Sequence, residues 1–183
     1  MNYTCYQSIP KPSEYRTIFV MRDPKDALLS WYFSMRDSHP VLGEVSKIRV
    51  ILTELSLEEG LLYSIKALEK QAYFECIASW SKADLKDHER ILLFEDLVES
   101  EEKMVDYLLK FFSVDLSLKE QSRLVDRHKF SNKKEKVSNS NHYRRGIVGE
   151  WEKYFSTKVN SVMNGVLTSH GIDYISFLSS HSN

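Results

Sequence analysis

Two short apolar runs, each followed at once by a helical pattern of apolar positions, dominate the hydrophobic pattern of this chain. Ile18, Phe19 and Val20 form the first run, and residues 90–97 (RILLFEDL) contain the second. Uninterrupted apolar runs of this length are typical of strands that are buried in a parallel sheet. The pattern therefore predicts an α/β fold in which a short parallel sheet is flanked by helices.

The residues after the first run carry the signals of a helix start. Asp23 suits an N-cap, and Pro24 suits a first helical position, where an amide hydrogen has no partner. Asp26 adds negative charge to the first turn, which a helix N-terminus favours. The apolar face of the predicted helix consists of Ala27, Leu28, Trp31, Tyr32 and Met35.

The same pattern predicts further helices along the chain. Ser56 opens a capping box, and the apolar stripe after it predicts one long helix that ends near Trp80. Ser117 opens another capping box, for a helix that ends near His128. Residues 1–14 are polar and contain two prolines, so we expect them to be irregular or extended.

The composition is that of a soluble globular protein. With 183 residues, 42% hydrophobic and 28% charged, the chain suits a single domain over residues 1–183. A formal net charge of −1 gives no general attraction to nucleic acid. The sequence has no apolar run long enough to span a bilayer and no signal-peptide pattern at its start. We therefore expect neither a nucleic acid nor a membrane as a partner.

Cysteine and histidine usage indicates no metal chemistry. Cys5 and Cys76 make neither a disulfide framework nor a metal-binding pattern, which favours a reducing cytoplasm. A lone histidine is more often solvated or structurally bonded than catalytic, so none of the six is assigned a catalytic role. We therefore expect no metal and assign no catalytic residue.

Arg22 stands where the first predicted strand ends and the first helix begins. In open α/β sheets the carboxyl ends of strands face ligands, and a helix N-terminus presents unpaired amide donors to an anion. Arg22 adds a planar fork of donors that suits phosphate oxygens, and Ser30 offers a hydroxyl. Two interpretations stay open on these residues: an anion site, or a structural ion pair of Arg22 with Asp23 or Asp26.

Positive charge is concentrated a second time between residues 133 and 145. The lysines of residues 133–136 suit a solvated loop. Arg144 and Arg145 differ, because they precede Gly146, which lets backbone amides approach an oxyanion closely. These three residues are therefore candidates for anion binding.

Two segments resemble motifs of the cytosolic-type sulfotransferases, which use 3′-phosphoadenosine 5′-phosphosulfate as donor. RDPKDALLS at residues 22–30 resembles the family segment R-N-P-K-D-x-x-x-S, and YRRGIVGEW at 143–151 resembles R-K-G-x-x-G-D-W. The resemblance extends from about residue 15 to 154. It implies that one 3′-phosphate is held by Arg22, Ser30, Arg144, Arg145 and Gly146.

The resemblance also suggests where the adenine would lie. Residues 90–97 are similar to a family strand that ends in Y-E-D-L, whose tyrosine contacts the adenine, and Phe94 takes that place. Phe130 resembles a family phenylalanine beside the adenine. From the residues alone, Phe94 is equally well explained as the last buried residue of its strand. The implied reaction transfers a sulfuryl group to a hydroxyl or amine of a small-molecule acceptor.

The sequence departs from the family before Arg22. There the family has a strand, a glycine-rich loop for the 5′-phosphosulfate and a histidine base, and the six glycines of this chain build no such loop. We expect a domain that lacks this N-terminal part and resembles the later part of a sulfotransferase domain. The sequence leaves two alternatives to an active enzyme: a non-catalytic remnant that binds nucleotide or a partner, and a fragment that does not fold alone. It does not determine the acceptor, the oligomeric state or whether Met1 is the true N-terminus.

Overall fold

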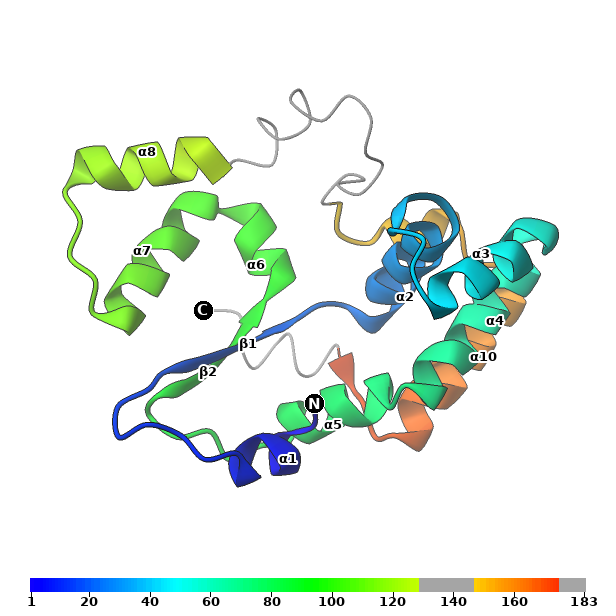
Figure 1. The fold of residues 1–183 in the computed structure, drawn as a ribbon, viewed down its shortest axis with the longest axis horizontal. Coiled ribbons are helices and arrows are strands. Elements are labelled where there is room, and N and C mark those ends of the chain that lie inside the picture. Colours follow the sequence, from blue (N-terminus) through cyan, green and yellow to red (C-terminus); the bar gives the residue numbers. More distant parts are fainter. Residues whose placement is uncertain (129–146, 175–183) are drawn as a thin grey trace.

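The computed structural model of the protein describes residues 1–128 and 147–174. Strands β1 (Thr17–Met21) and β2 (Glu89–Leu93) pair in parallel, with Thr17 opposite Glu89 and Met21 opposite Leu93. Because the two strands are parallel and in register, their carboxyl ends lie at the same edge of the sheet (Figure 1). The predicted α/β class with a parallel sheet is confirmed.

The remaining elements are helical. Between the strands lie α2 (Pro24–Phe33), the π-helical turn η1 (Ser34–Ser38), α3 (Glu44–Glu54), α4 (Leu57–Lys70) and α5 (Tyr73–Ser81). After β2 follow α6 (Phe94–Glu99), α7 (Glu101–Phe112), α8 (Leu118–His128), the 3₁₀ turn η2 (Glu150–Lys153) and α10 (Thr157–Ser169). Among the described residues 1–128 and 147–174, none of the helices has the length and apolar character needed to cross a membrane.

The helices cover the two faces of the sheet. Side chains alternate along a strand, so Phe19 faces α5, where its ring stacks on Trp80 at a centroid distance of 4.5 Å. On the other face, the Arg90 guanidinium lies 5.3 Å from the ring centroid of Phe111 in α7. Figure 1 accordingly shows α6 and α7 on one side of the strands and α4 and α5 on the other. A sheet covered in this way resembles a layered α/β domain.

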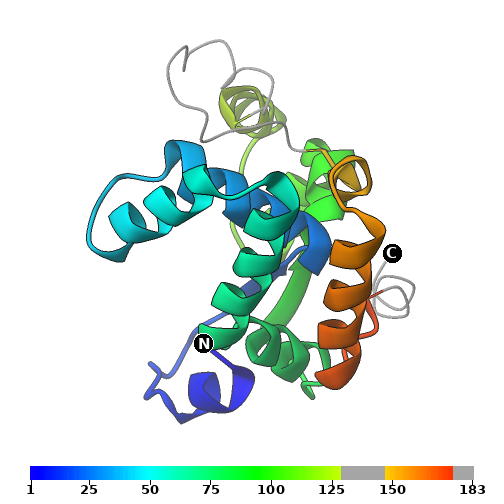
Figure 2. The same cartoon turned by 90° about the vertical axis from the view of Figure 1, so that its right-hand side faces the viewer.

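The core lies on the α5 side of the sheet, where α2, α4 and α10 meet. In Figure 2, α4 and α10 run side by side. The fully buried side chains of these helices include Leu28, Tyr32, Leu61, Ile65, Val159 and Met163. This packing presents the N-terminal end of α2 to the carboxyl ends of the strands, which positions the site described below.

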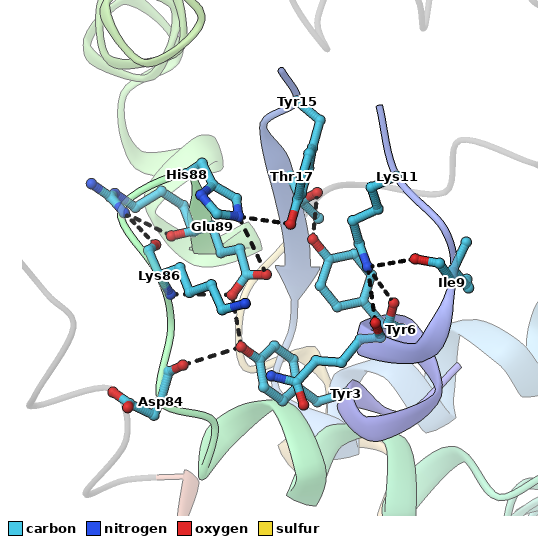
Figure 3. A network of polar contacts seen from close by, with 12 residues as sticks. Tyr3, Tyr6, Ile9, Lys11, Tyr15, Thr17, Asp84, Lys86, His88 and Glu89 are labelled. Atoms are coloured by element: carbon cyan, nitrogen blue, oxygen red, sulfur yellow. Dashed lines mark hydrogen bonds and ion pairs between the residues drawn. The ribbon is translucent and has the colours of Figure 1, made fainter. Parts of the chain in front are cut away.

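The expectation that residues 1–14 are irregular or extended is wrong for Tyr3–Ser8, which form helix α1. Tyr3 is buried, and its hydroxyl donates to Glu89 Oε2 at 2.7 Å (Figure 3). The Tyr6 hydroxyl donates to Thr17 Oγ1 at 2.8 Å, at the start of β1. A six-residue helix is too short to be stable by itself, so these tertiary contacts stabilise it, and the sequence pattern does not reveal them.

The single long helix expected between Ser56 and Trp80 is two helices. The Ser56 capping box is confirmed, and so is the one at Ser117. Ala72, however, adopts a left-handed conformation with φ 55° and separates α4 from α5. Both helices bury apolar residues at helical spacing, so the apolar stripe continues across the break and does not indicate the change of direction.

The first predicted strand forms, but it is not buried throughout. Met21 is buried, whereas the side chain of Val20 is 58% exposed. In the described residues, β1 pairs only with β2 and is therefore an edge strand. Because side chains alternate along a strand, Val20 points to the face opposite Phe19 and Met21, and it stays exposed there.

Candidate functional site

The residues that follow β1 and β2 meet at the carboxyl edge of the sheet. Met21 is opposite Leu93 in the register, so Arg22 and Phe94 come next on neighbouring strands. The Arg22 Cζ lies 4.5 Å from the centroid of the Phe94 ring. This is the geometry of a cation–π contact, which orients the guanidinium group. The structure therefore brings together two of the residues that the sequence singled out.

The guanidinium group of Arg22 has spare hydrogen-bonding capacity. Its Nη2 donates to the Ile147 carbonyl at 3.3 Å. Its Nε is buried and has no hydrogen-bond partner among the residues that the structure describes. Burial of a polar N–H without a partner is costly, so this N–H is suited to donate a hydrogen bond to a ligand oxygen.

The alternative interpretation of Arg22, an ion pair with Asp23 or Asp26, is wrong within the described part of the chain. Asp23 Oδ1 accepts from the Lys25 amide at 2.7 Å, which confirms it as the N-cap of α2. The two oxygens of Asp26 accept from backbone amides of another segment. Within the described residues, neither carboxylate forms a salt bridge with Arg22, and both accept from backbone amides.

Asp26 joins the start of α2 to the segment that follows residue 146. This side chain is only 1% exposed. The Gly149 N–H donates to Asp26 Oδ2 at 2.6 Å, and the Trp151 N–H donates to Asp26 Oδ1 at 3.0 Å. The sequence predicts for Asp26 only a contribution to the charge of the first helical turn or an ion pair with Arg22. Its role in binding a distant loop was missed, because a sequence gives no direction for a side chain.

A third polar group, Glu95, joins the ends of the two strands. Its Oε1 accepts from the Asp23 amide at 2.9 Å, and its Oε2 accepts from the Tyr174 hydroxyl at 2.9 Å. Burial raises the pKa of Asp23, and the nearby carboxylates of Asp26 and Glu95 add to the effect. Burial likewise raises the pKa of Tyr73, and the Arg22 charge opposes that shift. The end of the sheet is therefore a desolvated polar region in which electrostatic interactions are stronger than at the surface.

The other predicted site residues are placed only in part. Ser30 is exposed on α2. Phe130, Arg144, Arg145 and Gly146 lie outside the described residues. The first described residue after them is Ile147, whose carbonyl accepts from Arg22.

The described ranges, 1–128 and 147–174, contain no group of three or more His, Cys, Asp or Glu side chains that could hold a metal ion. The expectation that the protein needs no metal stays a prediction.

Two solved structures with a similar fold are complexes with PAP. One is mouse sulfotransferase SULT7A1 complexed with PAP, which matches with a TM-score of 0.62 and 20% identity over 91% of this chain and 62% of that chain. The other is retinol dehydratase in complex with androsterone and inactive cofactor PAP, which matches with a TM-score of 0.63 and 14% identity over 93% of this chain and 57% of that chain. At these identities, the likeness is one of fold.

Sequence comparisons agree with the fold. The chain is 24% identical to Sulfotransferase 6B1 of Danio rerio over 155 residues, which cover 81% of this chain and 49% of the relative. It therefore spans about half the length of that relative. The family model described as "Sulfotransferase domain" matches residues 4–170, which is most of the chain. On this match, and in agreement with the two motifs, the chain belongs to the sulfotransferase domain family.

Proposed function

We propose that this protein binds 3′-phosphoadenosine 5′-phosphosulfate and transfers its sulfuryl group to a hydroxyl or amine of a small-molecule acceptor. The observation that carries the proposal is the buried Nε of Arg22, which has no partner among the described residues. A phosphate oxygen would satisfy this donor, and a charge-assisted bond of this kind contributes about 1.5–3 kcal/mol. The 3′-phosphate of the donor is the group that we place here.

The surroundings of Arg22 support an anion at this position. The N-terminus of α2 begins two residues later and contributes a partial positive charge. The Phe94 ring supports the guanidinium group from one side. Arg144, Arg145 and Gly146 directly precede Ile147 in the sequence, and the Ile147 carbonyl is bound to Arg22. This short sequence separation favours their approach to the same phosphate.

The donor site in this proposal combines residues from several separate segments of the chain. Arg22, Ser30, Arg144, Arg145 and Gly146 bind the 3′-phosphate, and Phe94 and Phe130 lie beside the adenine. The neighbour structures complexed with PAP support an adenine nucleotide as the ligand class. The proposal involves no metal, and it places the protein in the cytoplasm as a single domain.

In the proposed reaction, the acceptor oxygen or nitrogen attacks the sulfur atom and the bond from sulfur to the 5′-phosphate oxygen breaks. Adenosine 3′,5′-bisphosphate leaves, and the acceptor proton passes to a base. Binding the 3′-phosphate orients the donor but does not by itself stabilise this transition state. We assign no base among the residues of this chain.

A second candidate function is nucleotide binding without transfer. It is favoured by one observation: the contacts described at Arg22 provide for the 3′-phosphate, and binding this group does not by itself stabilise the transition state. Both candidates require the same 3′-phosphate site, so they differ in turnover and not in binding.

Calorimetric titration with adenosine 3′,5′-bisphosphate tests the site. We expect saturable binding that Arg22→Ala weakens by at least about tenfold, or roughly 1.4 kcal/mol. Arg123→Ala is the matched control, because Arg123 is exposed on α8. Folded protein that binds no bisphosphate would reject both candidates.

Turnover with isotopically labelled donor distinguishes the two candidates. The acceptors are a panel of a phenol, an alcohol and an amine, and the product is the sulfated acceptor. Transfer that is lost in Arg22→Ala supports the enzyme. Binding without transfer to any of the three acceptor classes supports the nucleotide-binding alternative.

A further inference from the structure

We infer that Glu95 is a positioning residue for Arg22. Its carboxylate holds the backbone next to Arg22, so that the guanidinium group keeps its place on the Phe94 ring and its Nε stays available to a phosphate oxygen. Glu95 itself does not touch the phosphate. This role rests on the proposed function, because the phosphate is the one that Arg22 binds there. Every side chain involved lies within residues 1–128 and 147–174.

The Glu95 carboxylate bridges two segments that are far apart in sequence. Its Oε1 accepts from the Asp23 amide and its Oε2 accepts from the Tyr174 hydroxyl, each at 2.9 Å. Tyr174 is buried, and burial together with the Glu95 charge raises the pKa of its hydroxyl, which therefore stays protonated and donates. Both oxygens of Glu95 thus have a donor, and these two hydrogen bonds fix the orientation of the side chain.

The Asp23 amide needs a partner from outside its own helix. Asp23 is the N-cap of α2, and the amides at the start of a helix have no partner within the helix. In a capping box, the third helical residue reaches back to this amide. That residue is Asp26 in α2, and its oxygens accept instead from Gly149 and Trp151. Glu95, from α6, therefore supplies the second half of the cap.

Arg22 consequently lies between two fixed positions. On one side, Met21 is the last residue of the paired strand β1 and is buried. On the other side, the Asp23 amide is bound by Glu95. The backbone of Arg22 then has little freedom, and the Phe94 ring, 4.5 Å from the guanidinium carbon, orients the side chain. Loss of the Glu95 contact would free Asp23 and let the guanidinium group leave the ring.

The hydrogen bonds of Glu95, and not its charge, are what Arg22 needs. A carboxylate opposes a bound anion electrostatically, so its negative charge gives no advantage beside a phosphate site. Glutamine has the same length, and its carbonyl oxygen can accept from the Asp23 amide while its NH₂ group donates to the Tyr174 hydroxyl. Leucine can do neither. Glu95→Gln and Glu95→Leu therefore separate the two hydrogen bonds from the charge.

Calorimetric titration of these two variants tests the role. The readout is the affinity for adenosine 3′,5′-bisphosphate divided by the affinity for adenosine 5′-monophosphate, which has no 3′-phosphate. We expect Glu95→Leu to lower this ratio at least about fivefold and Glu95→Gln to keep it within about twofold. Glu99→Leu, at an exposed position of α6, is the matched control and should keep the ratio. A general loss of stability would not change the preference of the folded molecules for the 3′-phosphate.

A variant without the guanidinium group shows whether Glu95 acts through Arg22. In the Arg22→Ala background, Glu95→Leu should lower the ratio no further, because there is no side chain left to position. An effect of the same size in that background would overturn the role. An unchanged ratio in Glu95→Leu alone, or an equal loss in Glu95→Gln, would also overturn it.

Hydrogen exchange followed by NMR gives a test that applies even if Glu95→Leu does not fold. In the unchanged protein, the Asp23 amide should be protected before any ligand is added, although it takes no part in the hydrogen bonds within α2. If the unchanged protein binds bisphosphate and this amide is unprotected, the role of Glu95 alone is wrong. If the unchanged protein binds no bisphosphate, the proposed function fails and the role of Glu95 fails with it.

Discussion

Arg22 and Phe94, which follow different strands, stack with the guanidinium carbon 4.5 Å from the ring centroid. The two positions are 72 residues apart in sequence, and the parallel register of β1 and β2 alone makes them neighbours. A planar cation above an aromatic face is held in one orientation while its edge stays available to a ligand. The contact therefore links the fold of the sheet to the proposed anion site.

Replacing the ring under Arg22 should weaken anion binding without unfolding the protein. Phe94→Leu keeps an apolar side chain but removes the π face, and a cation–π contact contributes about 0.5–1 kcal/mol at a partly exposed site. We expect the affinity for adenosine 3′,5′-bisphosphate, measured by calorimetry, to fall about threefold. Phe94→Tyr keeps the face and should bind at least as well as the unchanged protein. Phe112→Leu, at an exposed position of α7, is the control and should change nothing.

Gly149 should resist substitution for conformational and not for steric reasons. Its φ is +75°, and a Cβ added there would meet nothing within 4 Å. Gly149→Ala should therefore lower the free energy of unfolding by about 1 kcal/mol, the cost of a left-handed conformation for a residue with a Cβ. Gly165 in α10 also has open space but a helical backbone, so Gly165→Ala should raise the free energy of unfolding by about 0.5–1 kcal/mol. Urea denaturation measures the free energy of unfolding of both variants. If Gly149→Ala and Gly165→Ala changed it by the same amount and in the same direction, the conformational explanation would be refuted.

Gly60 should be required for the close approach of α4 to α2. A Cβ at Gly60 would lie 2.6 Å from Cε2 of the buried Tyr32 ring. Gly60→Ala should therefore destabilise the protein by about 1–3 kcal/mol, even though alanine is the better helix former. The combination with Tyr32→Leu, which removes the ring, should restore part of that loss. Strictly additive effects of the two changes in urea denaturation would argue against the contact.

The Tyr3–Glu89 contact predicts a loss of stability at high pH (Figure 3). Burial, together with the hydrogen bond to Glu89, raises the pKa of Tyr3 from 10.0 to about 12. The folded state thus holds this proton more tightly than the unfolded state. The stability that it contributes is complete below pH 10 and is lost as the pH rises towards 12.

Tyr3→Phe removes this titration together with the hydrogen bond. The variant should be less stable than the unchanged protein at pH 8, and the difference between the two should shrink between pH 10 and 12. Tyr107→Phe is a control, because Tyr107 is partly exposed on α7. The free energy of unfolding in urea at each pH gives the result, and a difference that does not depend on pH would contradict the assignment.

Local sequence signals predicted the elements well where short-range chemistry decides them. Asp23 and Pro24 correctly marked the start of α2, and Ser56 and Ser117 marked capping boxes, because a cap depends on residues within one turn. Both strands were also predicted. The break at Ala72 and helix α1 were missed, because they depend on contacts between residues that are far apart in sequence.

For the site, the two motifs were sufficient to predict the family, which the family model over residues 4–170 confirms. The roles of Ser30, Phe130, Arg144, Arg145 and Gly146 in binding stay predictions. The choice between an anion site and an ion pair at Arg22 could not be made from the sequence, since Asp23 and Asp26 are both within reach of an arginine in an unfolded or partly folded chain. In the described residues Arg22 forms no ion pair with either, and both carboxylates accept from backbone amides.

By itself, the sequence determined the α/β class, the caps of the helices and the family, since these follow from residue type and spacing over short stretches. Only the tertiary structure decided that Phe94 lies under Arg22 and that Asp26 binds the amides of Gly149 and Trp151. The physical reason is that these contacts depend on strand register and on the direction of buried side chains. Both are set by the packing of the whole core, and no local pattern encodes them.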